Sequence, residues 1–593
     1  MSTHRISSAL VLAVLAAAPP AGAQSVGPAE APAAAVAPAV APPLRLAEGR
    51  SAAPLIALRS ARDGAPDQLE ALAEWNRSGQ LPVRVGFARP LPLVRKVELT
   101  AARLENEAIN ALAGGYVAPS LRGDLVWSTH VGVAGAHRLR LHLADTALPP
   151  GTRFWVWGLG EEPQSFGLEL MGEGGDLWTP SVGGESIFLE VEVPRAALIS
   201  DVGKAARFTL REVSQSFRLD AEGQPLENAP SALDLSCLDD ATCTGAGVLG
   251  FIAQYRRAVA YLQFIDDGTE FLCSGALVND TVAATFVPYL LTANHCFDTQ
   301  ASASTLEAFW DFKTNTCDGP APGLGGLPRS NGATLLATSA NSDFTFLRLN
   351  SAPGTRVFLG WNAEASAVPN NTQLFRISHP LGESQGFSRS TVKTSGVPVC
   401  AGAPRPRFLY SQLTDGATFG GSSGAPVILA SGQIVGQLTG GCGDDPEEGC
   451  DYTNSEYDGA FSATFPAISA FLTPAATVCT PNRTTLCLSA GRFQVQATWQ
   501  PPGGAATPAR AVGLTPDSGY LTFSDPDNVE MVVKLVNACG LNSRYWVFAA
   551  GLTNVRVVTT VTDTSTGTVK TYTNPQGTAF APLQDTNAFA TCP

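Results

Sequence analysis

Twelve cysteines divide this chain of 593 residues into three parts. None occurs before Cys237, eight lie between Cys237 and Cys450, and four lie between Cys479 and Cys592. Both groups are even, as two separately disulfide-bonded units require, and neither has the CxxC or histidine-rich spacing of a metal site. A chain of this length is also too long for one hydrophobic core. We therefore expect a cysteine-free N-terminal unit, two disulfide-bonded units, and no metal or other cofactor.

The N-terminus has the features of a secretory signal peptide. His4 and Arg5 precede the apolar run SALVLAVLAAAP, and Ala21-Gly22-Ala23 follows as an A-x-A cleavage site. The run is too short for a membrane anchor, and no later stretch is apolar enough to cross a bilayer. We expect residues 1–23 to be removed and the mature protein to be secreted, extracellular or periplasmic, without a membrane span.

Composition and the spacing of apolar residues divide the chain before residue 231 into a linker and a folded unit. Residues 24–46 form a Pro/Ala-rich tract that predicts a linker. Residues 47–230 combine helical spacing at 66–76 with strand-like alternation at 138–143, 153–159 and 186–193, which predicts a folded, β-rich α+β unit.

The two cysteine-containing units are predicted to be all-β. Residues 231–475 hold many short apolar strands separated by Gly, Pro, Asn and Asp, as in a β-barrel or sandwich. Residues 476–593 repeat the pattern on a smaller scale, with strands expected at 492–499, 529–536, 544–550 and 555–563, and predict a small β-sandwich. The net charge of −14 and the absence of a basic block argue against nucleic acid as a partner.

Three residues of the 231–475 unit have the types and order of a catalytic triad. His295 follows an apolar strand in LLTANHC, Asp343 begins the strand SDFTFLRL, and Ser423 lies in GGSSGAP. The spacings are roughly fifty and about eighty residues, the scale seen in two-barrel serine peptidases. His379 is the only other histidine after residue 142, and its ISHPLGES context favours a loop residue over a general base.

These motifs resemble those of chymotrypsin-like serine peptidases, and most closely the bacterial secreted lysyl endopeptidase-like peptidases. SCLDDATC, TANHC, SDFTFL, HPLGE, GSSGAP and QLTGG are similar to the family's motifs in the same order, from about Cys237 to Phe471. The resemblance implies a chymotrypsin-like double β-barrel, with residues 47–230 as a propeptide domain. It implies a serine endopeptidase that acts on protein or peptide substrates and has its own propeptide as a partner.

The resemblance also implies roles for individual residues. Ser423 would be the nucleophile, since it precedes Gly424 as the motif requires, with Ser422 as its neighbour. Gly421 and Ser423 would supply the oxyanion-hole amides. Substrate would pair with the strand Thr439, Gly440 and Gly441.

Substrate specificity is less defined. The position of the family's lysine-binding aspartate falls on Ser455, with Glu456 and Asp458 beside it, so that a shift of one residue would change the assignment. Ala417 stands where trypsin-like enzymes keep an acid. A lysine preference at P1, the substrate residue before the cut, and a small-polar or apolar preference therefore both remain open.

Family-like pairing implies the disulfides Cys273–Cys296 and Cys243–Cys317. Cys237 and Cys400 would share Cys442 and Cys450 in an order that the sequence leaves open. In the last unit, Cys479–Cys487 would close a short loop, and Cys539–Cys592 would fasten the C-terminus.

The sequence also predicts how peptidase activity would be controlled, and it leaves two alternative functions open. Ser422 replaces the aspartate of trypsin-type zymogens, so control is expected from residues 24 to about 230, acting as folding aid and inhibitor. A secreted binding or adhesion protein on a catalytically weak peptidase scaffold is the alternative, and a narrow processing peptidase is a third hypothesis.

Asp525 and Asp527 fit a calcium ligand set, although SDPDN favours an ordinary turn.

Overall fold

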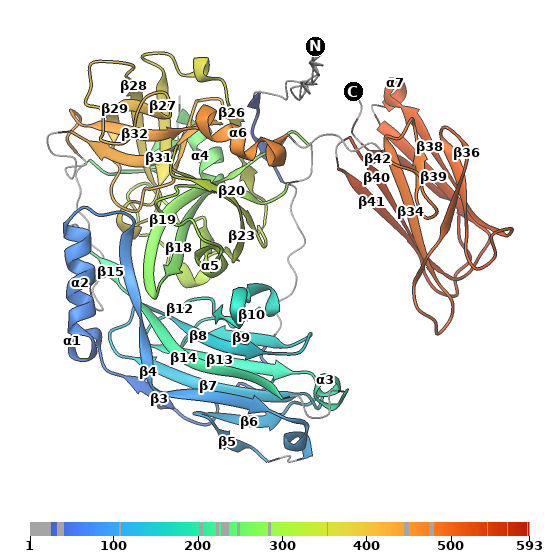
Figure 1. Cartoon of the computed structure of the whole chain (residues 1–593), viewed down its shortest axis with the longest axis horizontal. Coiled ribbons are helices and arrows are strands. Elements are labelled where there is room, and N and C mark those ends of the chain that lie inside the picture. Colours follow the sequence, from blue (N-terminus) through green and yellow to red (C-terminus); the bar gives the residue numbers. More distant parts are fainter. Residues whose placement is uncertain are drawn as a thin grey trace, which may run out of the picture.

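The structure is a computed structural model. It describes residues 25–31, 41–105, 108–200, 205–220, 225–226, 237–245, 249–282, 286–352, 354–443, 450–473, 479–542, 544–565, 567–589 and 591. The signal peptide expected at 1–23 and Cys592 lie outside these residues. We call residues 41–226 the N-terminal region, 237–473 the central region and 479–591 the C-terminal region (Figure 1).

The N-terminal region is built from two sheets that pack face to face. Trp127 on one sheet contacts Phe208 on the other edge-to-face, with 5.3 Å between ring centroids. The first sheet contains β3 (Ile56–Leu58), β5 (Asn110–Leu112), β6 (Gly115–Pro119), β7 (Leu125–Val133), β9 (Arg153–Trp157), β10 (Gln164–Phe166) and β13 (Ser186–Val193). The second contains β4 (Val83–Leu99), β8 (Arg138–Ala147), β11 (Leu177–Trp178), β12 (Val182–Gly183) and β14 (Ala206–Ser216).

Helices and a short hairpin flank these sheets. They are α1 (Ala61–Gly64), α2 (Pro66–Arg77), α3 (Arg195–Ser200), β15 (Arg218–Leu219) and β16 (Pro225–Leu226). The helix predicted at 66–76 is α2, and the strands predicted at 138–143, 153–159 and 186–193 are β8, β9 and β13. Pro66 begins α2 because a proline at the first helical position has no amide hydrogen to leave unsatisfied.

The central region contains two curved sheets, as the predicted double-barrel fold requires. The first follows the order β22 (Arg329–Asn331), β21 (Glu307–Trp310), β18 (Val259–Asp266), β19 (Thr269–Val278), β20 (Tyr289–Thr292), β24 (Phe344–Leu349) and β23 (Ala333–Ser339). The second closes on itself in the order β31 (Gln433–Cys442), β30 (Pro426–Ile428), β27 (Gln373–Ser378), β28 (Gly386–Val392), β29 (Phe408–Gly416), β32 (Ser455–Ala460) and back to β31.

Short elements complete the central region. They are β17 (Asp239–Asp240), α4 (Phe251–Tyr255), α5 (Gln300–Thr305), β25 (Val357–Phe358), β26 (Gly360–Asn362) and α6 (Phe461–Leu472). None of the helices in the described part of the chain is long and apolar enough to span a membrane. The protein is mostly β, with a chymotrypsin-like central region.

The C-terminal region is a β-sandwich of two five-stranded sheets around one core. One sheet holds β33 (Leu486–Leu488), β34 (Phe493–Gln500), β35 (Thr507–Pro508), β40 (Arg556–Asp563) and β41 (Val569–Asn574). The other holds β36 (Arg510–Thr515), β37 (Ser518–Thr522), β38 (Val529–Ala538), β39 (Arg544–Gly551) and β42 (Leu583–Phe589), and α7 (Cys539–Asn542) follows β38. The four strands expected here are β34, β38, β39 and β40.

One sheet runs through both the N-terminal and the central region. β4 pairs antiparallel with β19, in a register that sets Phe87 opposite Thr269 and Val83 opposite Leu272. On its other side β4 pairs with β14, where Gly86 is required because a Cβ would overlap the Gln215 carbonyl. The two regions therefore share main-chain hydrogen bonds in addition to side-chain contacts.

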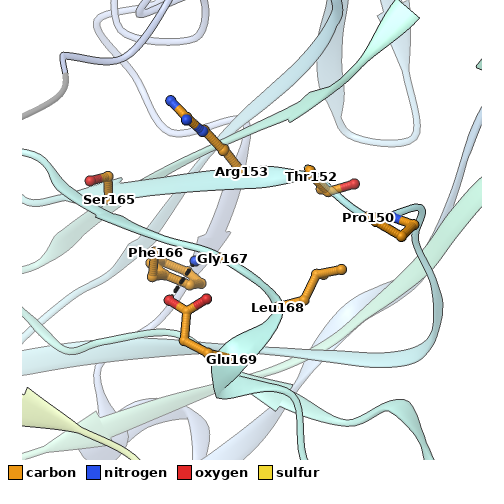
Figure 2. Close-up of a pocket in the computed structure, with 9 residues that line it drawn as sticks. Pro150, Thr152, Arg153, Ser165, Phe166, Gly167, Leu168 and Glu169 are labelled. Atoms are coloured by element: carbon orange, nitrogen blue, oxygen red, sulfur yellow. Dashed lines mark hydrogen bonds between the residues drawn. The ribbon is translucent and has the colours of Figure 1, made fainter. Parts of the chain in front are cut away.

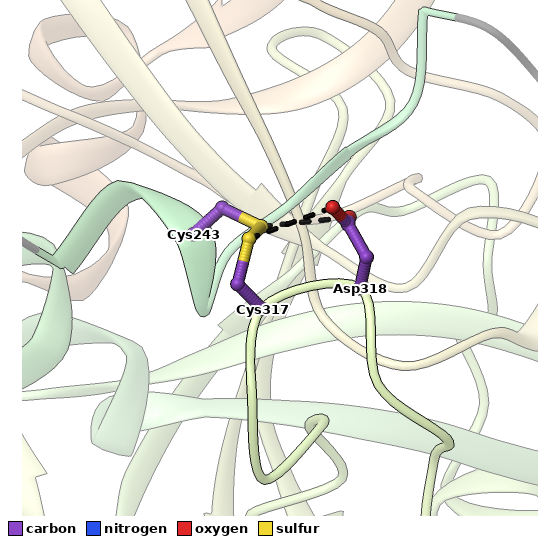
Figure 3. A group of neighbouring side chains, drawn as sticks. All are labelled: Cys243, Cys317 and Asp318. Carbon is purple, nitrogen blue, oxygen red and sulfur yellow. Dashed lines mark hydrogen bonds between the residues drawn. A yellow bond between two sulfur atoms is a disulfide. The ribbon is translucent and has the colours of Figure 1, made fainter.

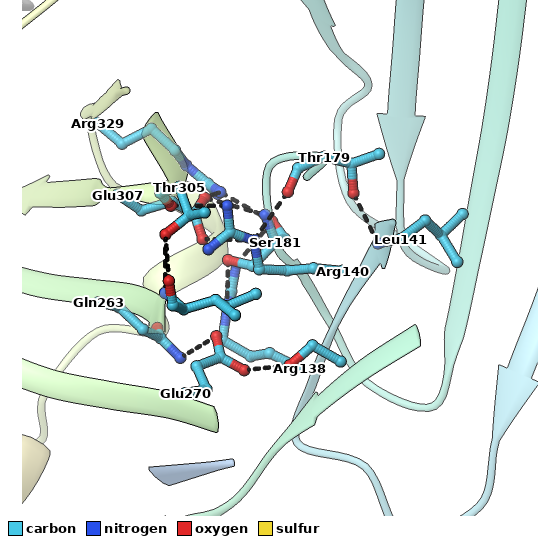
Figure 4. A network of polar contacts seen from close by, with 12 residues as sticks. Arg138, Arg140, Leu141, Thr179, Ser181, Gln263, Glu270, Thr305, Glu307 and Arg329 are labelled. Carbon is cyan, nitrogen blue, oxygen red and sulfur yellow. Dashed lines mark hydrogen bonds and ion pairs between the residues drawn. The ribbon is translucent and has the colours of Figure 1, made fainter. Parts of the chain in front are cut away.

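A buried polar network also joins the N-terminal region to the central region (Figure 4). The Glu307 carboxylate accepts hydrogen bonds from the Ser181 amide at 2.9 Å and from Arg329 at 3.0 Å, and it lies 3.8 Å from Arg140. Burial alone would raise the pKa of Glu307, but Arg140 and Arg329 outweigh it and hold the pKa below its usual value. Glu307 therefore stays ionised inside the boundary.

The tract predicted as a linker at 24–46 carries contacts at both of its ends. Ser25–Val26 (β1) pairs with β26, and Ala29–Glu30 (β2) pairs with β25. At the other end, the amides of Leu44, Arg45 and Leu46 donate to the buried carboxylate of Glu190. These described residues are part of the fold, because main-chain and carboxylate hydrogen bonds hold them, Leu46 is buried and Val26 packs against the central core.

Five disulfides join pairs of cysteines that both lie among the described residues. Cys273–Cys296, Cys243–Cys317 and Cys479–Cys487 are the expected pairs. The order that the sequence left open is Cys237–Cys450 and Cys400–Cys442. The expected pairing of Cys539 involves Cys592, which lies outside the described residues.

Removing the Cys273–Cys296 disulfide, by changing both cysteines to alanine, should lower the free energy of unfolding of the central region by about 2–4 kcal/mol, because the bridge joins the end of the His295 strand to β19. Scanning calorimetry on the full chain measures this as a lower transition temperature for the central region. The matched control removes Cys479–Cys487 and should move only the C-terminal transition. The same shift in both variants would contradict the prediction.

Candidate active site

His295 and Asp343 are brought together by two paired strands. His295 follows β20, and Asp343 immediately precedes β24, with Thr292 opposite Thr345 in the register. Asp343 has a φ of 49°, a left-handed conformation that turns its carboxylate back toward the histidine loop. The loop itself is fastened to β19 by the disulfide between Cys296 and Cys273.

The Asp343 carboxylate contacts His295 twice. One oxygen accepts the His295 main-chain amide at 2.9 Å, and the other lies 2.8 Å from Nδ1. A carboxylate at Nδ1 holds the proton on that nitrogen, which leaves the lone pair on Nε2. Nε2 is buried and has no hydrogen-bond partner among the described residues, so it is available as a base.

Ser423 stands on the turn between β29 and β30, against β19. Its carbonyl accepts from the Ser274 amide at 2.8 Å. Gly424, next in the chain, has a φ of 80°, and a Cβ on it would overlap Thr292 Oγ1. The glycine therefore lets the serine turn approach the histidine strand at backbone distance.

Residues that sequence reasoning missed hold the turn in shape. Ser274 Oγ donates to the Gly421 carbonyl at 2.9 Å, and the Leu381 amide donates to the Gly420 carbonyl at 2.7 Å. Ser422 is buried and its hydroxyl bonds Ser378 at 2.9 Å. With both carbonyls fixed, the amides of the turn keep one orientation. The serine in CSGALV was the available signal, but its partner lies more than a hundred residues away.

Two comparisons with known proteins match large parts of this chain. Residues 234–458 match the family model described as "Lysyl endopeptidase, C-terminal domain". "Lysyl endopeptidase" of Pseudomonas aeruginosa is 26% identical over 360 residues, covering 58% of this chain and 74% of that protein. The chain is lysyl endopeptidase-like.

Other similar proteins cover smaller parts of this lysyl endopeptidase-like chain. "Secreted RxLR effector protein 73" of Plasmopara viticola is 28% identical over 220 residues, 34% of this chain and 49% of that protein. Among solved structures, the active form of the Rv3671c protease from M. tuberculosis has a TM-score of 0.27 and 14% identity, covering 43% of this chain and 94% of that one. An HtrA-type protease with a tripeptide has a TM-score of 0.28 and 16% identity, covering 41% and 70%.

The strand expected to bind substrate lies next to β32 in this lysyl endopeptidase-like protein. Gly440 and Gly441 on β31 face Tyr457 and Glu456 on β32. Thr439 has a buried hydroxyl without a hydrogen-bond partner among the described residues. The three residues expected to contact substrate are therefore consecutive on one strand of the second barrel.

The structure gives Ser455 and Glu456 different partners. Ser455 is buried, and its hydroxyl donates to the Pro398 carbonyl at 3.0 Å. Glu456 instead reaches the nucleophile turn, where it accepts from Thr418 Oγ1 at 2.9 Å. Successive residues of a strand point to opposite sides, so of these two residues it is Glu456 whose side chain lies against the nucleophile turn.

Glu456 is a buried carboxyl without a cation of its own. Burial raises its pKa to about 7, although Arg376 partly opposes the rise. The hydrogen bonds of Arg376 go to other residues. It donates two to Asp458 and one each to Ser390 and Ser411. One oxygen of Glu456 has no hydrogen-bond partner among the described residues.

His379 has a structural position, as its sequence context predicts. It is fully buried, its ring stacks on Phe312 with 5.7 Å between centroids, and its Nδ1 lies 3.0 Å from the Glu383 carbonyl. Burial lowers the pKa of His379 to about 4. Its own carbonyl closes over Gly421, where a Cβ would come within 2.7 Å of that oxygen.

Part of the N-terminal region lies against the candidate site. A Cβ on Gly420 would overlap Val83, and one on Gly440 would lie 3.7 Å from Leu81. Helix α2 braces this Leu81–Val83 segment, because Trp75 donates to the Pro82 carbonyl at 2.9 Å. The segment therefore sits both beside the nucleophile turn and on the substrate strand.

Three other features do not belong to the site. Cys243, Cys317 and Asp318 cluster, but the two sulfurs are bonded to each other and have no thiolate to offer a metal (Figure 3). A cavity of about 530 Å³ lies in the N-terminal region between Pro150 and Glu169, and the Glu169 carboxylate there accepts the Gly167 amide (Figure 2). Asp525 accepts the Asp527 amide at 2.9 Å, the hydrogen bond of an ordinary turn.

Asp458→Asn should destabilise the protein strongly, because it leaves the Arg376 guanidinium buried without a carboxylate. We expect a loss of about 3–5 kcal/mol in the free energy of unfolding, measured by denaturant titration. The control is Asp415→Asn, which breaks the partly exposed pair with Arg389 and should cost at most about 1 kcal/mol. Equal losses for the two variants would contradict the prediction.

Proposed function

We propose that this protein is a secreted serine endopeptidase that works through a triad of His295, Asp343 and Ser423. The observation that carries the proposal is the double contact from Asp343 to His295, which leaves Nε2 as a free base, while Gly424 lets the serine turn approach Thr292 at the end of the strand before His295. Lysyl endopeptidase similarity over residues 234–458 supports it. Five disulfides support export to an oxidising compartment.

The reaction would proceed by acyl transfer. Nε2 of His295 takes the Ser423 hydroxyl proton as Oγ bonds to the scissile carbonyl carbon, and Asp343 stabilises the imidazolium that forms. The amides of Gly421 and Ser423 would stabilise the oxyanion. His295 then gives its proton to the leaving amine, and a water molecule, deprotonated by the same nitrogen, releases the acyl group.

We assign the primary specificity to Glu456 and propose a basic P1 residue. The carboxylate lies beside Thr418, five residues before the nucleophile, on the strand that pairs with Gly441. Since Asp458 neutralises Arg376, Glu456 remains the carboxyl able to pair with a substrate cation. The small-polar or apolar preference that Ser455 would give is disfavoured, because Ser455 is bonded to Pro398.

The N-terminal region would keep the enzyme inactive as a precursor. Leu81 and Val83 occupy space over Gly440 and Gly420 that a substrate main chain needs. Residues 220–236 contain neither lysine nor arginine. An enzyme that cuts after basic residues would not open this connection itself, so maturation there would require a second peptidase of different specificity.

Ser423→Ala should abolish cleavage of a proteome-derived peptide library by protein cut N-terminal to Cys237, lowering kcat by roughly 10⁴–10⁶-fold. Asp343→Asn should retain binding and lose roughly 10⁴-fold in kcat, because the wrong tautomer is then favoured. Mass spectrometry of the digest measures both. Absence of any cut by correctly disulfide-bonded wild-type protein would favour the binding or narrow-processing alternatives.

Glu456→Gln should lower kcat/KM for substrates with Lys or Arg at P1 by about 10²–10³-fold, since a neutral amide cannot pair with the cation. Ser455→Ala is the matched control and should leave the P1 profile unchanged. The reverse result would return the assignment to Ser455.

The pH dependence gives a second test of the same assignment. A carboxyl with a pKa near 7 is protonated below that pH, so wild-type kcat/KM for basic P1 should rise through pH 7 as Glu456 ionises. Glu456→Gln should lose this limb, and an apolar P1 substrate should not show the part that depends on Glu456. Stopped assays with paired substrates from pH 5 to 9 would measure it.

A further inference from the structure

The first described residues of the chain lie along the central region rather than the N-terminal region. Ser25 and Val26 pair antiparallel with Asn362 and Trp361, and Ala29 and Glu30 pair with Phe358 and Val357. The Ala31 amide donates to the Arg356 carbonyl at 2.9 Å. The segment Ser25–Ala31 therefore adds a strand, in two short pieces, to β26 and β25.

The edge that receives this segment fits it at backbone level. β26 pairs on its other side with β31, so the segment covers its remaining edge. Gly360 is the point of closest approach: a Cβ there would overlap the Val26 carbonyl and come within 2.6 Å of Gly27. Pro28 falls between the two paired pieces, where the missing amide hydrogen costs no ladder bond.

Side chains of the central region also bind the main chain of the segment. Asn279 donates to the Gly27 carbonyl at 3.0 Å, and Gln433 donates to the Val26 carbonyl at 3.3 Å. Arg257 pairs with Glu30 at 2.8 Å. These groups bind an extended backbone of small residues and one acidic side chain.

We propose that the β25–β26 edge, with Asn279, Gln433 and Arg257, is a strand-addition site whose occupant is the chain's own segment Ser25–Ala31. The segment acts as a latch that holds the start of the precursor on the central region, independently of the β4–β19 pairing. The inference rests on the proposed function only in treating the N-terminal region as removable. Its test reads hydrogen exchange in a Ser423→Ala background, so its outcome does not depend on catalysis.

The site fits an extended peptide with small residues and a carboxylate, bound by strand addition. Its occupant lies just after the expected signal cleavage following Ala23, so the latch would be the N-terminus of the exported chain. Because the segment is tethered, a weak intrinsic affinity suffices to keep the site filled in the precursor. Once the tether is cut, the same edge becomes free for a peptide of this chemistry.

Gly360→Ala in the full-length Ser423→Ala protein tests the latch. The new Cβ overlaps atoms of the latch, so amide exchange in residues 25–31 should rise by at least about 10-fold. Exchange in β4 should stay unchanged, because β4 is held by β19 and β14. Gly326→Ala is the matched control, since its Cβ meets no atom within 4 Å and neither glycine has a positive φ.

A titration in trans gives the second measurement. A labelled peptide of residues 24–31 should bind, saturably and with one site, to a Ser423→Ala chain that lacks those residues, but not to the full chain, whose site is filled. A Glu30→Lys peptide should bind at least about 3-fold more weakly, because its exposed ion pair with Arg257 is replaced by repulsion. Unchanged exchange in Gly360→Ala, or equal peptide binding to both chains, would overturn the proposal.

Discussion

The carboxylate of Glu307 is the contact on which the position of the N-terminal region depends. It is buried at the boundary between the two regions. It accepts a hydrogen bond from the Ser181 amide of the N-terminal region and another from the Arg329 guanidinium of the central region. A buried charge without such partners would be strongly unfavourable, so the two sides are fixed in one relative position. In the same arrangement β4 pairs with β19, and Val83 lies over Gly420.

Glu456 and Asp458 show how one strand can give two carboxyls different chemistry. Both point to the same side of β32, since they are two residues apart. Asp458 has Arg376 directly against it and serves as a structural counter-ion, whereas Glu456 has a threonine hydroxyl and a pKa raised to about 7 by burial. Asp458 satisfies the buried arginine, and one oxygen of Glu456 has no hydrogen-bond partner among the described residues, which is the basis of its proposed role in selecting a substrate cation.

The sequence predicted the parts of the site that are encoded locally. Strands at β8, β13 and β38 follow from alternation, and the candidate triad follows from motifs in which each residue stands beside its own strand or turn. The assignment of Ser455 over Glu456 depended on a one-residue register, which is set by the pairing of β32 with β31 and by the partner at Pro398. Ser274, Leu381 and the latch could not be found from local patterns, because each acts through a partner far away in the chain.

The nucleophile turn is already assembled while the N-terminal region is in place. Ser422 stands where trypsin-type zymogens carry an aspartate, and its hydroxyl is bonded to Ser378 inside the barrel. The carbonyls of Gly420 and Gly421 are held by Leu381 and Ser274, all of them from the central region itself. Among the described residues this support comes from the central region, so the proposed removal of the N-terminal region requires no rearrangement of the turn. Inhibition in the precursor would therefore act by covering the strand at Gly440, and activation would consist of uncovering it.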